Sequence, residues 1–193
     1  MVNKISTPIR CSWCGDDPLY QKYHDEEWGV PNFEDRYLFE CLMLEGAQAG
    51  LSWITVLRKR DNYRLAFDQF DAVKIAKYSE KKLLKLKENT GIIRHEGKIR
   101  AAVGNAKAYL NIINDEGSFA NFLWRYVDGK PIQNQVKTLS DIAASTDIST
   151  ALSKDLKKAG FKFVGPTITY AFMQAVGMVN DHCVDCHCYK DSA

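Results

Sequence analysis

The placement of the cysteines and histidines constrains the fold of this chain more than any other feature. Five of the six cysteines and three of the four histidines lie in two short segments near opposite ends of the sequence. These end segments contain Cys11, Cys14, His24, His182, Cys183, Cys186, His187 and Cys188. Any four of these side chains could form a closed tetrahedral zinc site, which would require the two ends of the chain to meet. Such a metal would tie down segments that otherwise fray.

The spacing leaves the ligand set open. Two C-x-x-C pairs suggest one set of four thiolates, made of Cys11, Cys14, Cys183 and Cys186. Sets that mix sulfur and nitrogen are equally allowed by zinc chemistry, and free thiols are the alternative to a metal. Enough ligands are present to fill every position around an ion, so nothing indicates a catalytic metal. Cys41 and His95 lie apart from the ends and are interpreted as a core thiol and a surface imidazole.

Length and composition limit the classes of protein to which the chain can belong. With 193 residues, 46% of them hydrophobic and 26% charged, it is long enough for one domain with a substantial core. Its net charge of +2 means that nucleic-acid binding would need a local basic face. No apolar run approaches the roughly 18 residues that span a bilayer, and residues 1–8 lack the apolar block of a signal peptide. We therefore expect a cytoplasmic protein with reduced thiols and no membrane partner.

Apolar residues recur with helical spacing along most of the chain, and no segment shows the clean alternation of a strand. Asp17 and Pro18 have the chemistry of a helix start, as a capping residue and a first helical residue. Further helices are expected over 35–44, 62–70, 71–86, 99–113, 117–127, 149–158 and 167–176, with Ser149 as a cap. The polar region 132–149 is expected to be a loop. These patterns predict an all-α fold with short connections.

Residues 43–54 are the most informative internal segment. A continuous helix here would carry on one face Glu45, Gln48, Ala49, Ser52 and Trp53. Its opposite face would pack into the core and would carry Leu44, Ala47, Leu51 and Ile54. The polar face combines a carboxylate, an amide, a hydroxyl and an indole on a floor of small residues, which a flat ligand could approach. The alternative is an ordinary helix with an isolated glutamate and a buried tryptophan.

A second informative segment, 154–167, has the composition of two helices joined by a tight hairpin. Gly160 and Gly165 allow sharp turns, and Pro166 would open the second helix. The unpaired N–H groups of a helix start can bind phosphate. Lysines at positions 154, 157, 158 and 162 outnumber the single acidic residue, Asp155, and make a local basic patch. Bound to DNA, the hairpin would hold phosphates through backbone amides without reading sequence; the alternative is a plain helical hairpin with solvated lysines.

Four motifs carry a resemblance to a known family. They read YHDEEWGVP at 23–31, LEGAQAGLSWITVLRKR at 44–60, GIIRHEGKIRAAVGNA at 91–106 and LKKAGFKFVGPTITYAFMQAVGMVNDH at 156–182. In this order they closely resemble the 3-methyladenine DNA glycosylase I family of helix–hairpin–helix DNA glycosylases. The likeness runs from about residue 11 to residue 188, and several of the motifs are long and unusual, so the match is specific.

The resemblance implies an all-α helix–hairpin–helix DNA glycosylase fold in a single domain over 1–193, with the helix–hairpin–helix at about 150–177. It implies a structural zinc that joins the terminal segments 11–28 and 180–188 through Cys11, His24, His182 and Cys186. The set of four thiolates is then not expected. The other candidates, Cys14, Cys183, His187 and Cys188, would be bystanders or alternative ligands.

The same resemblance implies roles for the aromatic and polar residues. Taken alone, Tyr20, Tyr23 and Trp28 would be assigned to the core, because three rings so close together usually pack there. In the family pattern, Glu45 and Tyr23 would be the catalytic residues and would form hydrogen bonds with an extruded base. Trp53 would stack on that base. The rest of the base pocket would be Trp28, Tyr20 and Gln48. Leu51 would be the wedge in the duplex, and further DNA contacts would come from Lys162, Phe163, Val164, Gly165 and Thr167.

The implied activity is removal of 3-methyladenine from alkylated double-stranded DNA, which leaves an abasic site. Methylation at N3 makes the base cationic, so it leaves as a neutral molecule and little acid catalysis is needed. Aromatic faces prefer a cation by roughly 0.5–2 kcal/mol, and Glu45 can favour the charged base over neutral adenine. Phe163 and Thr167 stand where the wider superfamily has a glycine and a lysine, so a Schiff-base lyase step is not expected. Glu45 is preferred over Asp181 as the catalytic carboxylate.

Two other functions fit parts of the sequence. A DNA-binding module with the hairpin and the zinc but no chemistry would not need a carboxylate beside an aromatic floor. A related glycosylase could prefer 3-methylguanine or 7-methylated purines. We expect a monomeric, monofunctional hydrolase with methylated double-stranded DNA as its substrate and free 3-methyladenine as its product.

Overall fold

The structure, a computed structural model, describes residues 8–189 of the chain. Its helices are α1 (Pro18–Glu26), α2 (Asp35–Gln48), α3 (Trp53–Leu57), α4 (Arg60–Ala66), α5 (Ala72–Ile75), α6 (Glu80–Glu88), α7 (Glu96–Glu116), α8 (Phe119–Trp124), α9 (Asp147–Ala159) and α10 (Pro166–Ala175). Two short strands, β1 (Ile132–Gln133) and β2 (Val179–Asn180), pair in parallel. The predicted all-α class is confirmed. Region 132–149 is not wholly the predicted loop, because it contains β1, a 3₁₀ turn at Leu139–Asp141 and the start of α9 at Asp147.

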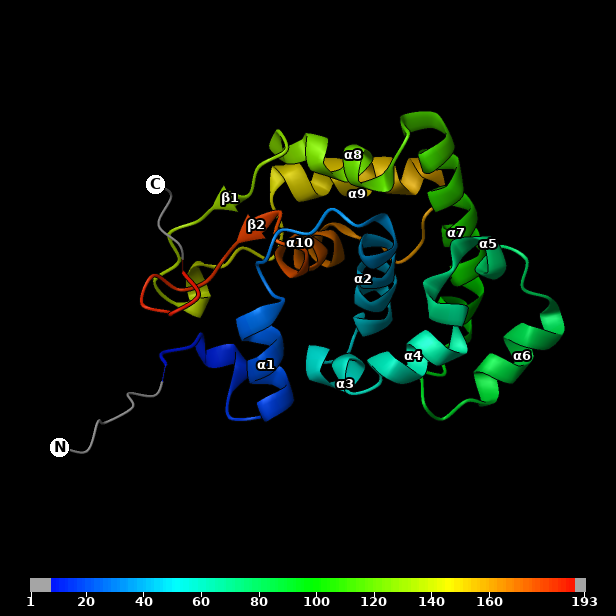
Figure 1. Cartoon of the computed structure of the whole chain (residues 1–193), viewed down its shortest axis with the longest axis horizontal. Coiled ribbons are helices and arrows are strands. Elements are labelled where there is room, and N and C mark those ends of the chain that lie inside the picture. The colour runs from blue at the N-terminus through cyan, green and yellow to red at the C-terminus, as the bar shows by residue number, and fades with distance from the viewer. Residues whose placement is uncertain (1–7, 190–193) are drawn as a thin grey trace.

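Helix α2 is the centre of the fold, with α7, α8 and α10 packed against it (Figure 1). Its side chains Leu38, Phe39, Leu42 and Leu44 are at most 2% exposed. Burial of each side chain of this size contributes about 1.5–3 kcal/mol, so the position of α2 is strongly determined by the core. Glu45 follows these residues on the same helix. Core packing of α2 therefore holds this carboxylate in the interior.

The continuous helix predicted through 43–54 is wrong, because α2 ends at Gln48 and α3 begins at Trp53. Gly50 adopts a φ of +83°, which reverses the chain between the two helices. The turn leaves Ser52 exposed and Leu51 42% exposed, although the helical pattern had placed Leu51 in the core. Its exposed side chain leaves room for the other expectation for Leu51, the role of a wedge in the duplex that the family resemblance implies.

Helix α7 braces two functional segments through side chains two turns apart. Lys98 donates from Nζ to the carbonyls of Ala47 and Ala49, at 2.8 and 2.7 Å, and so satisfies acceptors that the end of α2 leaves unpaired. Asn105 donates from Nδ2 to the carbonyl of Lys162 at 3.1 Å and accepts from the Lys162 amide at 2.8 Å. The end of α2 and the hairpin after α9 are thus tied to the same helix.

The hairpin between α9 and α10 forms as predicted. Gly160 ends α9 with a φ of +106°, and Pro166 is the first residue of α10. Phe163, at the tip, has a φ of +60°, a conformation that is uncommon for a residue with a side chain. A Cβ atom on Gly46 of α2 would lie 3.3 Å from the Phe163 Cβ, so the hairpin packs directly beside Glu45.

Other helix boundaries follow local chemistry with some differences. Asp17 caps α1 as predicted, and Ser118 caps α8. Thr146 caps α9 in place of the predicted Ser149, which occupies the third position of the same capping box. The helix predicted over 71–86 is divided into α5 and α6. The helix predicted over 62–70 is α4, which begins earlier, at Arg60, and ends earlier, at Ala66.

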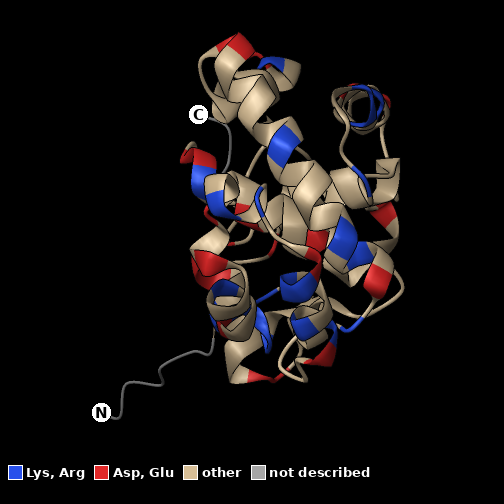
Figure 2. Ribbon diagram, turned by 90° about the vertical axis from the view of Figure 1, so that its right-hand side faces the viewer, with Lys and Arg blue, Asp and Glu red and all other residues tan. Residues whose placement is uncertain are grey.

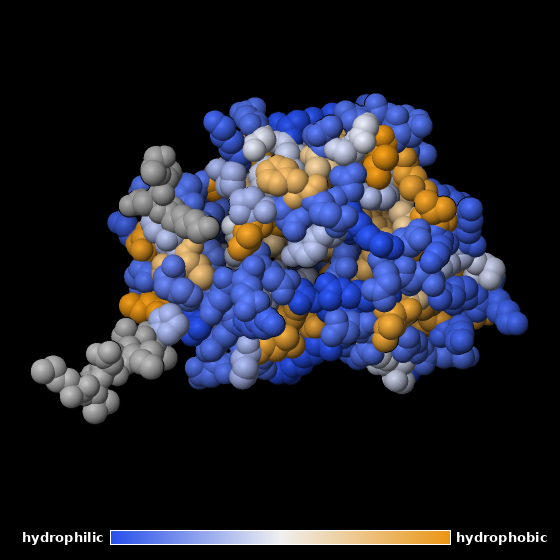
Figure 3. All heavy atoms as spheres, in the orientation of Figure 1, coloured by the Kyte–Doolittle hydropathy of each residue, from blue (hydrophilic) through white to orange (hydrophobic). Residues whose placement is uncertain are grey.

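The surface offers no simple signature of function. Basic and acidic residues are both present on the face turned to the viewer in Figure 2, and hydrophobic residues form separate patches among hydrophilic ones on the face in Figure 3. Among the described helices, none has the length and apolar character needed to cross a membrane. The site must therefore be sought in a specific group of residues.

Gly177, after α10, provides a test of the packing between this helix and the segment before α2. It has a φ of +71°, and a Cβ atom there would lie 2.3 Å from Pro31 N. Replacing Gly177 with alanine should lower the free energy of unfolding by about 2–4 kcal/mol, because backbone strain and overpacking add. Denaturant unfolding measures the change. Gly104→Ala is the control, since that exposed helical position has open space for a Cβ and the variant should be more stable by about 0.5–1 kcal/mol. Equal stability of the two variants would contradict this packing.

Candidate active site

A pocket of about 410 Å³ lies between α1, the end of α2, α3 and α10. One wall is aromatic and consists of Trp13, Tyr20, Tyr23, Trp28 and Trp53. The segment 139–144 forms an apolar wall with Leu139, Ile142, Ala143 and Ala144. The polar lining residues are Glu45, Gln48 and Gln174. All six residues assigned to base recognition or catalysis from the sequence thus surround one cavity.

The aromatic wall is built around Trp13. Its ring centroid lies 4.9 Å from that of Tyr20 and 4.9 Å from that of Trp28, both in edge-on geometry. Tyr23 and Trp53 are 5.5 Å apart at their ring centroids. These contacts fix several π faces around one space, which suits a flat, electron-poor ligand.

Glu45 is the chemically unusual group in this pocket. The residue is only 3% exposed, and its Oε2 has no hydrogen-bond partner. Burial raises the pKa of Glu45 to about 8, because desolvation disfavours the carboxylate. Burial also raises the pKa of Tyr20 to about 12, with a further contribution from Glu45, so its hydroxyl stays protonated. A carboxyl group with a perturbed pKa in a cavity is typical of a functional site.

Three residues that line the pocket carry unsatisfied polar atoms. Within residues 8–189, the buried side-chain nitrogen and oxygen atoms without a hydrogen-bond partner are Trp13 Nε1, Glu45 Oε2 and Trp53 Nε1. All three residues line the same cavity. Buried polar groups are normally paired, so their coincidence here indicates a ligand that would supply the missing partners.

The predicted DNA-contacting residues lie outside the pocket. Lys162 and Thr167 are exposed on either side of the hairpin turn. Val164 is 1% exposed, and its carbonyl accepts from Ser153 Oγ at 2.6 Å and from Thr169 Oγ1 at 3.2 Å, so only its backbone N–H could contact a partner. Gly165 precedes α10 and has no capping side chain, which leaves the first amides of that helix free to bind an anion.

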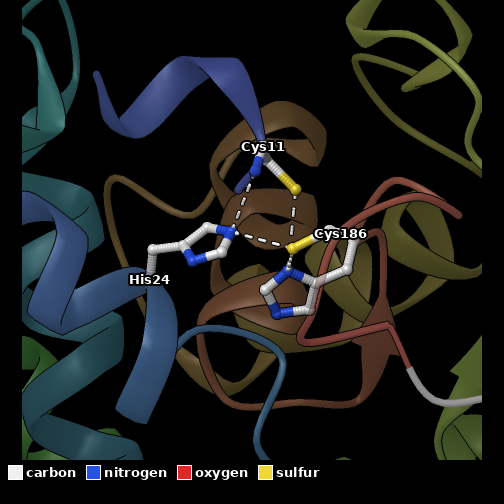
Figure 4. A group of neighbouring side chains, drawn as sticks. Cys11, His24 and Cys186 are labelled. Carbon is white, nitrogen blue, oxygen red and sulfur yellow. Dashed lines mark hydrogen bonds between the residues drawn. The ribbon is translucent and has the colours of Figure 1, made fainter. Parts of the chain in front are cut away.

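A second group joins the two ends of the chain. The ligand atoms of Cys11, His24, His182 and Cys186 all lie within 4.8 Å of one another, and all four residues are buried. Figure 4 shows the labelled side chains of Cys11, His24 and Cys186 directed toward a common point. The alternative set with Cys14 and Cys183 is wrong, because neither belongs to this group. The Cys14 thiol instead donates to the carbonyl of Cys11.

The geometry of this group fits a tetrahedral metal ion. Zinc bonds of about 2.3 Å to sulfur and 2.0–2.1 Å to nitrogen place such ligands about 3.5 Å apart. The Cys186 Sγ lies 3.5 Å from His24 Nε2 and 3.6 Å from His182 Nδ1, and Cys11 Sγ lies 3.6 Å from the same Nδ1. The outer ring nitrogens contact Asp25 Oδ1 at 2.8 Å and the Trp28 carbonyl at 3.0 Å, which orients both rings inward. Burial lowers the pKa of His182 to about 4, so its ring is neutral, as a metal ligand must be.

Sequence reasoning missed part of the pocket. Trp13 was overlooked although it lies between Cys11 and Cys14, and its position beside α1 follows once Cys11 and His24 meet in one group. Gln174 was overlooked within an otherwise apolar helix. The wall at 139–144 had no signal in its sequence, which reads as a polar loop.

Comparisons with known proteins identify what this chain is similar to. Residues 13–189 match the model of the methyladenine glycosylase family. The DNA-3-methyladenine glycosylase 1 of Escherichia coli strain K12 is 57% identical over 180 residues, which cover 93% of this chain and 96% of that protein. A crystal structure of 3-methyladenine DNA glycosylase I superposes with a TM-score of 0.93 at 55% identity, covering 94% of this chain and 100% of the other. A variant of 3-methyladenine DNA glycosylase I in complex with 3-methyladenine superposes with a TM-score of 0.91 at 40% identity, covering 94% and 97%.

Proposed function

This chain belongs to the methyladenine glycosylase family and is a DNA-3-methyladenine glycosylase, and we propose that it excises the base in the pocket around Glu45. The observation that carries this proposal is that the three residues with unpaired buried polar atoms all line one aromatic cavity. A methylated purine extruded from the duplex would fill that cavity and pair those atoms. A related structure with bound 3-methyladenine supports the choice of ligand.

Recognition depends on the positive charge that methylation places on the base. Trp53 and Tyr23, whose rings contact each other, would both present π faces to the purine, and Tyr20, Trp28 and Gln48 would complete the enclosure. Each favourable cation–π contact is worth about 0.5–2 kcal/mol. Glu45 would ionise as the cationic ring approaches, because an opposite charge lowers the pKa of a carboxyl group. Neutral adenine would gain neither contribution.

The chemistry that follows is hydrolysis of the N-glycosidic bond. The C1′–N9 bond breaks with both electrons moving to the purine, whose positive charge is thereby cancelled. Water adds to C1′ and loses a proton to solvent, which leaves the abasic sugar and free 3-methyladenine. From its place in the pocket lining, Glu45 would stabilise the charged state of the base before bond cleavage. None of the residues described as lining the pocket is a lysine, so the reaction is expected to be monofunctional.

DNA would be held beside the pocket by the hairpin and the turn after α2. The free amides at the start of α10, together with Lys162 and Thr167, would contact phosphates without reading sequence. The exposed Leu51 would enter the space left by the extruded base. Since Phe163 packs against Gly46 next to Glu45, the phosphate contacts and the pocket would be separated by a fixed distance.

We further propose that Cys11, His24, His182 and Cys186 hold a structural zinc ion. The four ligands fill a tetrahedron, which leaves no open position for a substrate. When bound, the ion would supply a cross-link between the terminal segments 11–28 and 180–188. The chain would act as one cytoplasmic, monomeric domain with methylated double-stranded DNA as its partner.

Base release from methylated duplex DNA tests the proposed function. At pH 8.5, where Glu45 is largely ionised, the wild-type protein should release 3-methyladenine, and Glu45→Gln should slow release about 10- to 100-fold by loss of a charge-assisted contact. Chromatography of the freed bases measures both. Glu26→Gln is the control, because that exposed side chain ends α1 outside the pocket and should release base at the wild-type rate. Undiminished release by Glu45→Gln would remove this residue from the mechanism.

Metal content and stability test the proposed zinc site. Cys186→Ser should lose the metal and lower the free energy of unfolding by about 3 kcal/mol or more, because a buried cross-link is broken. Cys14→Ser removes an equally buried thiol outside the group and should keep one zinc per chain. Elemental analysis and thermal unfolding give the two readouts. A Cys186→Ser protein with full zinc content and unchanged stability would contradict the assignment.

A further inference from the structure

Asp181 lies behind the base pocket with both carboxylate oxygens occupied. It is 1% exposed, and its Oδ1 accepts from Asn134 Nδ2 at 2.6 Å. Its Oδ2 accepts from the Tyr170 hydroxyl and from Gln174 Nε2, each at 2.7 Å. Asp181 is not among the residues that line the pocket. The carboxylate is therefore not available to the sugar or the base.

These bonds determine which end of the Gln174 amide faces the pocket. Gln174 and Tyr170 are four residues apart on α10 and reach Asp181 from one side of the helix. A carboxylate oxygen only accepts, so the amide group must present its NH₂ to Asp181. The carbonyl Oε1 is then the free end of a side chain that lines the pocket, and no donor within residues 8–189 hydrogen-bonds to it.

We propose that Gln174 is a second acceptor for the methylated base and that Asp181 is the positioning residue that orients it. This inference rests on the proposed function of the pocket. A carbonyl dipole accepts from an exocyclic amino group and stabilises a positively charged ring, whereas it repels the lone pairs of ring nitrogens. Adenine carries the same amino group, so the preference for the methylated base would come from its positive ring, which the dipole of Gln174 and the charge of Glu45 would both stabilise.

The position of Asp181 also connects the pocket to the terminal metal group. It immediately precedes His182, and the Asn180 side chain accepts from the His182 amide at 3.1 Å. The segment that closes the two ends of the chain therefore delivers the carboxylate to α10. A merely structural role for Asp181 would affect stability without changing base preference.

A double-mutant cycle separates these roles. The affinity for free 3-methyladenine, and for adenine as the competitor, is measured by tryptophan fluorescence for the wild type, Gln174→Leu, Asp181→Asn and the double variant. Gln174→Leu should weaken 3-methyladenine binding about 5- to 10-fold through loss of one hydrogen bond. In Asp181→Asn, the new side-chain amide can donate as well as accept, so it no longer forces Gln174 to turn its NH₂ group toward position 181. The variant should therefore weaken binding of 3-methyladenine to a similar extent. In the Gln174→Leu background it should add no further loss, although stability still falls.

Tyr170→Phe provides the matched control, because it removes the other donor to the same Oδ2 and leaves Gln174 in place. It should bind 3-methyladenine as the wild type does and keep the same preference over adenine. If Asp181→Asn does not fold, the contrast between Gln174→Leu and Tyr170→Phe decides the question. Wild-type affinity in Gln174→Leu, or additive losses in the cycle, would overturn the roles assigned to Gln174 and Asp181 but not the proposed function of the pocket. A wild-type protein that binds no 3-methyladenine would overturn the proposed function as well.

Discussion

A carboxyl group buried without a partner is the constraint on which the arrangement of this protein depends. Glu45 is held at 3% exposure by a helix whose neighbouring side chains form the core, and burial raises its pKa to about 8. Burial of this carboxyl group is unfavourable by itself, since the charged form is desolvated and Oε2 has no hydrogen-bond partner. The packing of α2 offsets that cost. The group is thereby prepared for a cationic ligand, which would stabilise its charge inside the pocket.

The remaining architecture fixes the distance between this carboxylate and the surfaces that would hold DNA. Helix α7 ties down the end of α2 through Lys98 and the hairpin through Asn105, so that neither can shift independently. On the other side of the pocket, closure of the chain ends brings Trp13 beside α1 and Asp181 beside α10. Two rings of the Cys2His2 group pack against the aromatic wall, His24 at 5.3 Å from Trp13 and His182 at 4.7 Å from Trp28 between ring centroids, and so support its shape. Stability and recognition are therefore linked through the same contacts.

Local chemistry predicted much of the fold, and long-range contacts account for most of what it missed. The starts of α1 and α8 and the turn at Gly160 follow from capping and glycine conformations that depend on nearby residues. The break after Gln48 was missed because apolar spacing continues on both sides of it and Lys98, far along the chain, stabilises the helix end. Spacing alone left eight candidate metal ligands, and only the resemblance to a family reduced them to four. The role of Gln174 depends on a carboxylate from another segment.

The pH dependence of catalysis tests most directly the claim that Glu45 acts as a buried charge against a cationic base. The quantity to measure is kcat/KM for release of 3-methyladenine from methylated duplex DNA at constant ionic strength, for the wild type and Glu45→Gln. Because burial raises the pKa of Glu45 to about 8, the carboxylate is the minor form below that pH. Wild-type kcat/KM should rise about tenfold per pH unit below that value and level off above it, and the variant should lack this rise. A wild-type profile that is flat between about pH 6 and 9, or an identical profile in the variant, would contradict the account.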